Sequence, residues 1–234
     1  MILHSLIPFK RTLAKLFGIH LKFSFSQMGE DLIVKFILDA LKLKQISYLD
    51  IGANHPYNMN NTYLFYLLGM RGVCVEPNPV LFKKLKSIRK KDRCLNIGIG
   101  TGAKTTGKFF LTNNSLLSTF SEAEALQLEA AGQAKIISSQ EVELLNINLL
   151  IERYFDTCPD FISLDVEGLD LAILQEFDFG RFRPKIFCIE TVLFSNNLKG
   201  AKAEDIISLL QQNNYRVFAD TYINTIFVDN NLFD

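Results

Sequence analysis

Carboxylates stand at the ends of several short apolar runs in this chain. Asp50 lies near the end of the run 46–51, and Glu76 ends the run 73–76. Three more acids follow later runs: Asp165, Glu167 and Glu190. Ligands of an open parallel sheet lie beyond the carboxyl ends of its strands, and ionised carboxylates without partners are costly there. These acids therefore indicate a site for a cationic cofactor, a metal ion or proton transfer.

The first two runs predict one half of a nucleotide-binding α/β unit. Gly52 supplies a turn, a helix follows, and Glu76 ends the second strand, where it can accept hydrogen bonds from a ribose diol. Dinucleotide folds need Gly-x-Gly-x-x-Gly, but only Gly52 is present and residues 46–69 contain no Lys or Arg to meet phosphate. S-adenosylmethionine, a sulfonium cation without phosphate, suits this pattern. In the alternative interpretation, Asp50 and Gly52 form only a tight turn and Glu76 caps a helix.

A hydroxyl acceptor would need a group that removes its proton. Asp165, at the end of a central strand, His55, beside the turn after the first strand, and Glu167 are the candidate catalytic residues. In a second scheme, Asp165 and Glu190 supply oxygen ligands to Mg²⁺, which lowers the pKa of the hydroxyl. Structural roles stay open for three of them: His55 as a turn histidine, Glu167 as a helix cap and Glu190 as a solvated acid.

Composition narrows the class of protein. The chain has 25 Lys and Arg against 25 Asp and Glu, so net charge gives no reason to expect nucleic-acid binding. Its four cysteines show no Cys-x-x-Cys spacing, which indicates free thiols and a cytoplasmic location. No apolar run approaches the roughly 20 residues of a membrane span. Residues 1–25 read as a basic amphipathic leader that packs on the domain or makes weak contact with the inner membrane surface, and 26–234 as one domain.

Strands and helices alternate along that domain. Apolar runs predict strands at 46–51, 73–76, 93–99, 108–111, 161–166 and 184–191. Helical spacing or capping residues predict helices at 26–43, 62–68, 79–89, 144–155, after Gly168 and at 204–212. Two apolar runs at 216–219 and 225–228 predict a terminal hairpin. This order predicts an α/β fold with a mostly parallel sheet and one antiparallel edge strand.

Two segments outside this alternation have open interpretations. Residues 113–141 include a capping box at Ser121 and Glu124, and we interpret the segment as a lid over the acceptor pocket or as an ordinary surface excursion. Residues 83–93 are rich in Lys and Arg, which is typical of a solvated helix face and its exit loop.

Five motifs in chain order resemble the FkbM-type methyltransferases. They are SQMGED at 26–31, DIGANHP at 50–56, NTY at 61–63, RGVCVEPN at 71–78 and DVEG at 165–168. The resemblance covers roughly residues 24–229. It implies S-adenosylmethionine as cofactor and a class I, Rossmann-like fold with a seven-stranded sheet, helices on both faces and a C-terminal antiparallel hairpin.

The resemblance also implies roles for individual residues. Asp50, Gly52 and Asn54 would line the methionine side of the cofactor, and Glu76 would hold the ribose. Segment 165–168 would face the methyl group. The remaining cofactor-binding residues would be Gln27 and Glu30 of the first motif, and Asn96 and Gly98 of the turn that flanks the adenine.

The expected activity is methylation of a hydroxyl on a sugar, glycan, glycolipid or natural product, with a small-molecule, glycan or lipid-linked acceptor. Two other functions remain as alternatives. One is a non-catalytic nucleotide-binding or scaffold module, which would not need Asp165 and Glu167. The other is a nicotinamide-dependent oxidoreductase, against which the missing glycines argue.

Overall fold

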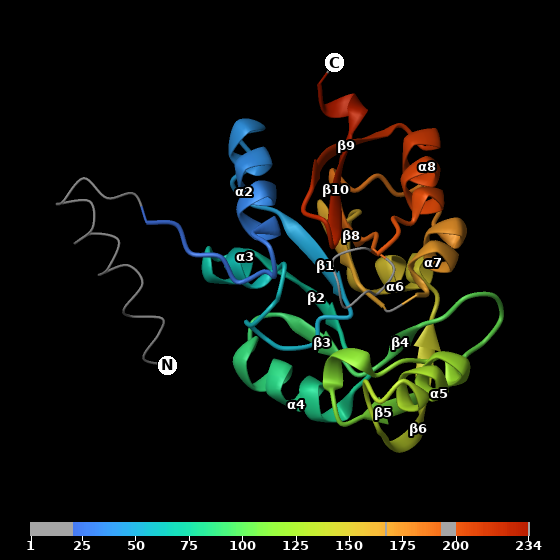
Figure 1. Cartoon of the computed structure of the whole chain (residues 1–234). Helices are drawn as coiled ribbons and strands as arrows, with labels where there is room; N and C mark the ends of the chain where they lie inside the picture. The colour runs from blue at the N-terminus through green and yellow to red at the C-terminus, as the bar shows by residue number, and fades with distance from the viewer. Residues whose placement is uncertain (1–20, 167, 193–199, 234) are drawn as a thin grey trace.

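The structure is a computed structural model, and it describes residues 21–166, 168–192 and 200–233. A large sheet with strand order β3-β2-β1-β7-β8-β10-β9 runs through the molecule (Figure 1). Only β10 runs in the direction opposite to the other six strands of this sheet. The prediction of a mostly parallel, Rossmann-like seven-stranded sheet is therefore confirmed. Its strands are β1 (Ser47–Ile51), β2 (Arg71–Val75), β3 (Arg93–Leu95), β7 (Phe161–Leu164), β8 (Ile186–Glu190), β9 (Tyr215–Asp220) and β10 (Asn224–Asp229).

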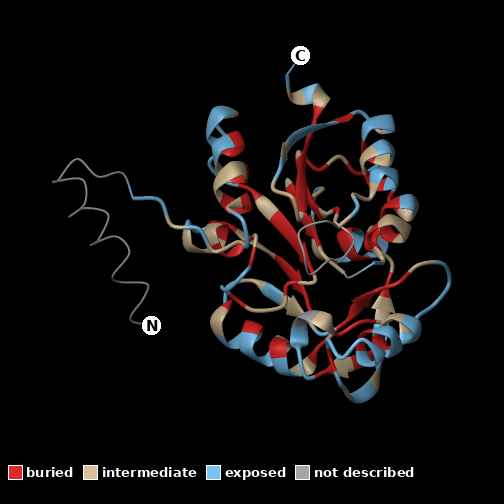
Figure 2. Cartoon of the chain, in the orientation of Figure 1, coloured by how far each residue is buried: buried red, intermediate tan, exposed pale blue. Residues whose placement is uncertain are grey.

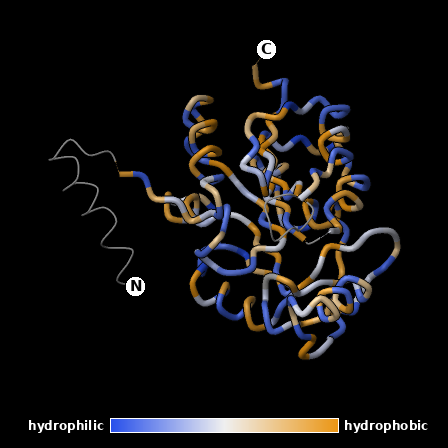
Figure 3. The backbone as a smooth tube through the Cα atoms, in the orientation of Figure 1, coloured by the Kyte–Doolittle hydropathy of each residue, from blue (hydrophilic) through white to orange (hydrophobic). Residues whose placement is uncertain are grey.

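Two layers of helices cover the two faces of the sheet. Their α-helices are α2 (Glu30–Ala40), α3 (Tyr63–Leu67), α4 (Pro79–Ile88), α6 (Ile147–Tyr154), α7 (Asp170–Glu176) and α8 (Glu204–Gln212). Alternate residues of each strand enter opposite cores: Leu49 packs with α6, α7 and α8, whereas Tyr48 packs with α2, α3 and α4. Figure 2 shows the buried sheet between helices whose outer sides are exposed, and Figure 3 shows apolar and polar segments alternating along those helices.

The chain ends in the expected hairpin, but its arrangement differs from the prediction. We expected the antiparallel strand at the sheet edge. Instead, α8 carries the chain from β8 past one strand position to β9, and β10 returns to fill the gap between them. The antiparallel strand is therefore internal and fully buried.

A second, three-stranded sheet corrects two predictions. The expected strand 93–99 is divided: β3 stays in the large sheet, while β4 (Gly98–Ile99) pairs with β6 (Ile136–Leu145), which also pairs with β5 (Thr106–Thr112). The predicted helix 144–155 begins later, because Asn146 caps α6 by accepting a hydrogen bond from the Asn148 amide, and the residues before it belong to β6. Strand β6 escaped prediction because only two of its ten residues are buried, so it has little apolar periodicity.

The segment 113–141 is built against this second sheet. It contains the 3₁₀ helix η1 (Ser115–Leu117), helix α5 (Glu122–Ala130) and the first half of β6. Ser121 caps α5 as predicted, since its hydroxyl accepts from the Glu124 amide at 3.2 Å. Movement of this segment as a lid stays a prediction.

Most of the leader lies outside the described residues. No helix in the described part of the chain is long and apolar enough to cross a membrane. A second 3₁₀ helix, η2 (Asn230–Leu232), ends the fold.

Candidate active site

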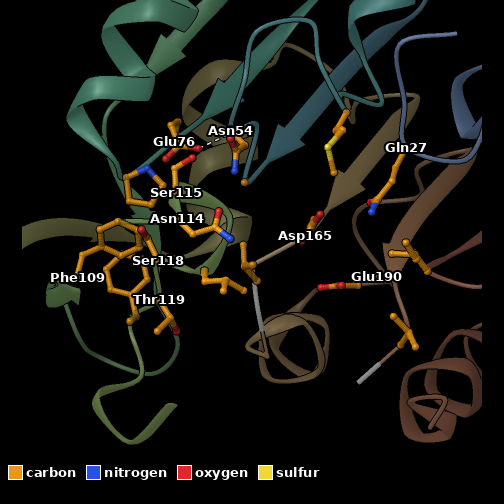
Figure 4. A pocket seen from close by; sticks show the side chains of 18 of the residues that line it. Gln27, Asn54, Glu76, Phe109, Asn114, Ser115, Ser118, Thr119, Asp165 and Glu190 are labelled. Carbon is orange, nitrogen blue, oxygen red and sulfur yellow. Dashed lines mark hydrogen bonds between the residues drawn. The ribbon is translucent and has the colours of Figure 1, made fainter. Parts of the chain in front are cut away.

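A cavity of about 350 Å³ opens at the carboxyl ends of β1, β2, β7 and β8. This volume lies within the usual range of small-molecule sites. Figure 4 shows Asn54 and Glu76 on one side, Gln27 on the other, and Asp165 and Glu190 between them. All five residues are among those predicted from the sequence. The cavity is lined by Gln27, Gly52, Asn54, Met59, Glu76, Pro77, Phe109, Asn114, Ser115, Leu117, Ser118, Thr119, Phe120, Asp165, Val166, Glu190, Val192, Tyr222 and Ile223.

Gly52 forms the floor where β1 meets its two neighbours. Its amide donates to the Val75 carbonyl at 3.1 Å, and its φ of 80° is in the left-handed region. A Cβ added there would lie 1.8 Å from the Asp165 carbonyl oxygen, far inside any contact distance. Glycine is therefore required both for the turn and for the close approach of β7.

Glu76 directly follows β2 and has only 4% of its surface exposed. One carboxylate oxygen accepts from the Asn54 amide and the other from the Asn78 amide, each at 2.7 Å. The helix cap of α4 is supplied by the Asn78 side chain rather than by Glu76. Burial raises the pKa of Glu76 to about 7, against the lowering effect of the two amides. A second lone pair on each oxygen remains for a ligand such as a diol.

Asp165 and Glu190 occupy the other part of the cavity. Asp165 follows β7, Glu190 ends β8, and Ile189 is the register partner of Leu164, so the two acids stand side by side. Their carboxyl groups are close enough for Glu190 to influence the ionisation of Asp165. Burial, together with the negative charges of Asp50 and Glu30, raises the pKa of Asp165 to about 6, although the interaction with Glu190 lowers it.

The wall opposite the sheet comes from residues 109–120. Phe109 and Phe120 pack with ring centroids 4.7 Å apart, and η1 supplies polar side chains such as Ser115. Gly98 lies behind this wall: a Cβ there would be 2.4 Å from the Phe120 ring. Gly98 therefore shapes the site by letting Phe120 pack, and it does not itself line the cavity.

Asp50 does not line the cavity, contrary to the role that the family resemblance implied. It is 3% exposed, and its Oδ2 accepts from Thr62 Oγ1 at 2.6 Å and from Asn60 Nδ2 at 3.1 Å. Asn60 Nδ2 also donates to the Ala53 carbonyl at 3.0 Å. Asp50 therefore holds the loop that carries Gly52 and Asn54 rather than facing the ligand space.

Arg89 completes this buried network and is the exception to the predicted solvated face at 83–93, whose other Lys and Arg residues are exposed. Its side chain is 0% exposed, and its Nε donates to Asp92 at 2.7 Å. Its other nitrogens donate to Thr62 Oγ1 at 2.9 Å, to Tyr48 Oη at 3.0 Å and to Asn60 Oδ1 at 3.2 Å. It follows α4, where the chain turns inward, so the Lys-rich pattern around it masked its burial. Asp50, an acid in a buried strand that needs a partner, was the only signal in the sequence.

Four further predicted site residues lie outside the cavity lining. His55 sits in a turn, where its Nδ1 accepts from the Asn58 amide at 3.2 Å, and burial and Lys84 lower its pKa. Asn96 donates to the carbonyls of Glu76 and Pro77, which fixes the end of β2. The other two are Gly98, described above, and Glu30, which accepts from Thr221 Oγ1 and Asn224 Nδ2. Glu30 therefore connects helix α2 to the β9–β10 hairpin.

Glu167, the remaining predicted catalytic residue, lies outside the described residues. In the ranges that the structure describes, no three His, Cys, Asp or Glu side chains gather in a way that could hold a metal ion.

The residues of the cavity fit S-adenosylmethionine. Three acids line it (Glu76, Asp165 and Glu190), and none of the described lining residues is Lys, Arg or His. Such a lining suits a ligand that carries a sulfonium and an ammonium group and has no phosphate to bind. Glu76 has the acceptor oxygens that a ribose diol needs.

The solved structures that resemble this chain are distant from it in sequence. A comparison with curated proteins finds no match. Similar solved structures include a TehB-like SAM-dependent methyltransferase from Corynebacterium glutamicum (11% identity, TM-score 0.42, 97% of both chains covered). Another is an O-methyltransferase from Bacillus cereus in complex with SAH (12% identity, TM-score 0.40, covering 96% of this chain and 88% of that chain). Chains this distant say nothing about the acceptor or the mechanism.

The family match is more extensive. The sequence model of the methyltransferase FkbM domain matches residues 50–217, more than half of the chain. That range includes Gly52, Glu76, Asp165 and Glu190. The chain therefore belongs to the FkbM methyltransferase family and is an S-adenosylmethionine-dependent methyltransferase.

Proposed function

We propose that the protein methylates a hydroxyl oxygen of a sugar, glycan, glycolipid or natural product. One observation carries the proposal: a neighbouring pair of carboxyl groups, Asp165 and Glu190, lines the same cavity as Gly52 and Glu76. A hydroxyl is a weak nucleophile that must lose a proton on attack, and a carboxylate can accept that proton. The cavity thus combines residues suited to the cofactor with a base suited to a hydroxyl.

The cofactor itself supplies an activated methyl group on sulfur. The protein has to bind it, orient it and bring the acceptor into line. Glu76 would hold the ribose, Gly52 and Asn54 would pass under the methionine part, and Pro77, Phe109 and Phe120 offer apolar surface beyond Glu76. Asp165 and Glu190 would face the acceptor from their part of the cavity lining.

The charge of the cavity favours an uncharged acceptor group. The described lining carries acids and no cation, so a phosphate or carboxylate close to the methyl group would be repelled. A neutral sugar ring presents only hydroxyls and apolar C–H faces, which match the carboxyl groups and the side chains of Met59, Val166 and Tyr222. The acceptor can still carry a charged or lipid-linked portion outside the cavity.

The cofactor assignment predicts a specific affinity loss. Glu76→Ala should weaken S-adenosylmethionine binding by about 1.5–3 kcal/mol, because hydrogen bonds from a diol to a charged acceptor are lost. Isothermal titration with S-adenosylmethionine, S-adenosylhomocysteine and NAD measures this. Glu204→Gln, at an exposed acid that starts α8, is the control and should bind normally. Tight binding of NAD with none of either adenosyl compound would overturn the assignment.

The same site predicts a pH dependence. With the pKa of Glu76 raised to about 7, protonation at lower pH removes the charged acceptor, so affinity for S-adenosylmethionine should fall as pH drops below about 7. Glu76→Gln should bind weakly at all pH values and show a flatter profile, provided its fold is intact by circular dichroism. A wild-type profile that is flat from pH 5 to 8 would contradict the assigned role of Glu76.

The activity is tested with radiolabelled S-adenosylmethionine and a panel of methyl glycosides that bear neutral, amino or carboxyl-containing sugars. We expect methyl ether formation on neutral sugars and little on those with a carboxyl group. Adding a chelator distinguishes the carboxylate base from the Mg²⁺ scheme, because an enzyme that keeps full activity after chelation does not use a metal ion. Methylation of nitrogen on the amino sugars alone would reject the hydroxyl as acceptor.

A further inference from the structure

The carboxyl groups of Asp165 and Glu190 stand at neighbouring strand ends and line the same cavity. A carboxylate is only an acceptor of hydrogen bonds, so two ionised carboxylates cannot bond to each other. Neighbouring carboxyl groups can bond to each other when one is protonated and the other ionised, and repulsion between two negative charges in one site favours that state. The parallel register of β7 and β8 sets this proximity, because Leu164 and Ile189 are partners just before the two acids.

Acids from four different elements act on Asp165 or are affected by its charge. Glu30 approaches from α2, Asp50 from β1, Glu76 from β2, and Asp170 from the start of α7. Asp170 accepts from the Val166 amide at 3.2 Å, and burial together with Asp165 raises its pKa to about 7. Such surroundings disfavour a second negative charge on the pair, so a single shared proton is retained.

The pair also has access to the ligand space. Both side chains are partly buried and both line the cavity (Figure 4). His55, the other candidate base from the sequence, does not line it. A base must lie within hydrogen-bond reach of the proton that it removes, and within the described residues only these two acids combine such access with distance from the ribose position at Glu76.

We propose that Asp165 and Glu190 act as one proton-sharing pair that removes the proton of the acceptor hydroxyl, which makes Glu190 a second catalytic residue. This inference rests on the proposed function. It gives Glu190 a role in the chemistry rather than in binding a metal or in solvation.

The step balances without another reactant. The hydroxyl proton passes to the ionised carboxylate as the hydroxyl oxygen bonds to the methyl carbon. The carbon–sulfur bond breaks with its electron pair left on sulfur, so the sulfonium becomes a neutral thioether. The pair, now carrying two protons, returns one to solvent before the next turnover. The pair loses its negative charge and the sulfur loses its positive charge in the same step, so the net charge in the cavity does not change.

The pair is tested by the pH dependence of kcat in the wild type, in Asp165→Asn and in Glu190→Gln. The wild type should lose activity below about pH 6 as the pair takes up its second proton. Asp165→Asn should lose about 10²–10⁴-fold in kcat, the range of general base catalysis. Glu190→Gln keeps a hydrogen-bond donor but removes the like charge, so kcat should fall and the acid limb should move to lower pH.

The controls separate chemistry from folding. KM and Kd for S-adenosylmethionine should stay within about threefold in both variants, as in the exposed control Glu204→Gln, whose pH profile should match the wild type. A fall in kcat for Glu190→Gln without any shift of the acid limb means that Glu190 only positions Asp165, and it overturns the pair. An unchanged kcat in either variant overturns it as well.

A second measurement needs neither variants nor an acceptor. Carboxyl carbon NMR of ¹³C-labelled wild-type protein should show two groups that titrate in coupled steps, one clearly above the ordinary range of acids. Two independent titrations near pH 4 would refute proton sharing even if methyl transfer is observed. Conversely, coupled titration without any transfer to the glycoside panel would support proton sharing and would reject these simple sugars as acceptors, so the two failures are distinguishable.

Discussion

Gly52→Ala should abolish measurable S-adenosylmethionine binding and lower the free energy of unfolding by roughly 2–5 kcal/mol, the sum of a left-handed conformation for alanine and an overpacked contact. The new Cβ would lie 1.8 Å from the Asp165 carbonyl oxygen and 2.9 Å from its carbonyl carbon. Both contacts are with backbone, so no side-chain rotation relieves them. The ends of β1 and β7 must separate, which moves Asp165 and the loop with Asn54 together.

The matched control is Gly69→Ala. Gly69 has a φ of 96°, similar to that of Gly52, but a Cβ there would meet nothing within 4 Å. This variant carries the conformational cost alone, about 1–2 kcal/mol, and should bind S-adenosylmethionine normally. Urea denaturation and titration calorimetry give both quantities. If Gly52→Ala resembles Gly69→Ala in both, the close approach of the strands does not support the site.

Arg89→Met should lower the free energy of unfolding by about 3–5 kcal/mol, because it leaves a buried acid without its cation. The side chains of Arg89 and Asp92 are both 0% exposed. Loss of Arg89 also removes the donors to Thr62 and Asn60, which hold the loop above the sheet. Affinity for S-adenosylmethionine should therefore fall along with stability.

Two further variants test whether the buried charge causes this loss of stability. Lys35→Met breaks the exposed ion pair with Asp39 on α2 and should cost no more than about 1 kcal/mol. Adding Asp92→Asn to Arg89→Met removes the uncompensated charge, so stability should recover in part, while the loop contacts remain lost and cofactor affinity stays low. Equal stability of Arg89→Met and Lys35→Met in urea would show that the buried network contributes little.

Much of the fold could be predicted because its signals are local. The runs that became β1, β2, β7 and β8 are continuous apolar segments, as expected of strands buried on both faces. Helix α8 was predicted with the bounds that the structure shows, since its apolar residues and its polar flanks are contiguous. Strand β6 was missed because its residues are mostly exposed and its pairing partners, β4 and β5, are distant in sequence.

The candidate site could likewise be predicted only in part. Glu76, Asp165 and Glu190 were predicted because each acid follows a buried strand, and strand direction alone sends parallel strand ends to one edge. The direction of a side chain at that edge was not predictable. Asp50 points into the helix-covered core toward Thr62, whereas Asp165 faces the cavity, and these orientations depend on which neighbours pack around each strand end.

The sequence by itself determined the strand ends, the single turn glycine and the family motifs, because these are properties of contiguous residues. Only the tertiary structure decided that Arg89 is buried, that residues 109–120 form a wall of the cavity and that Asp165 meets Glu190. Each of these depends on segments far apart in the chain, and the free energy of a buried charge or a shared proton is set by the groups that folding places around it.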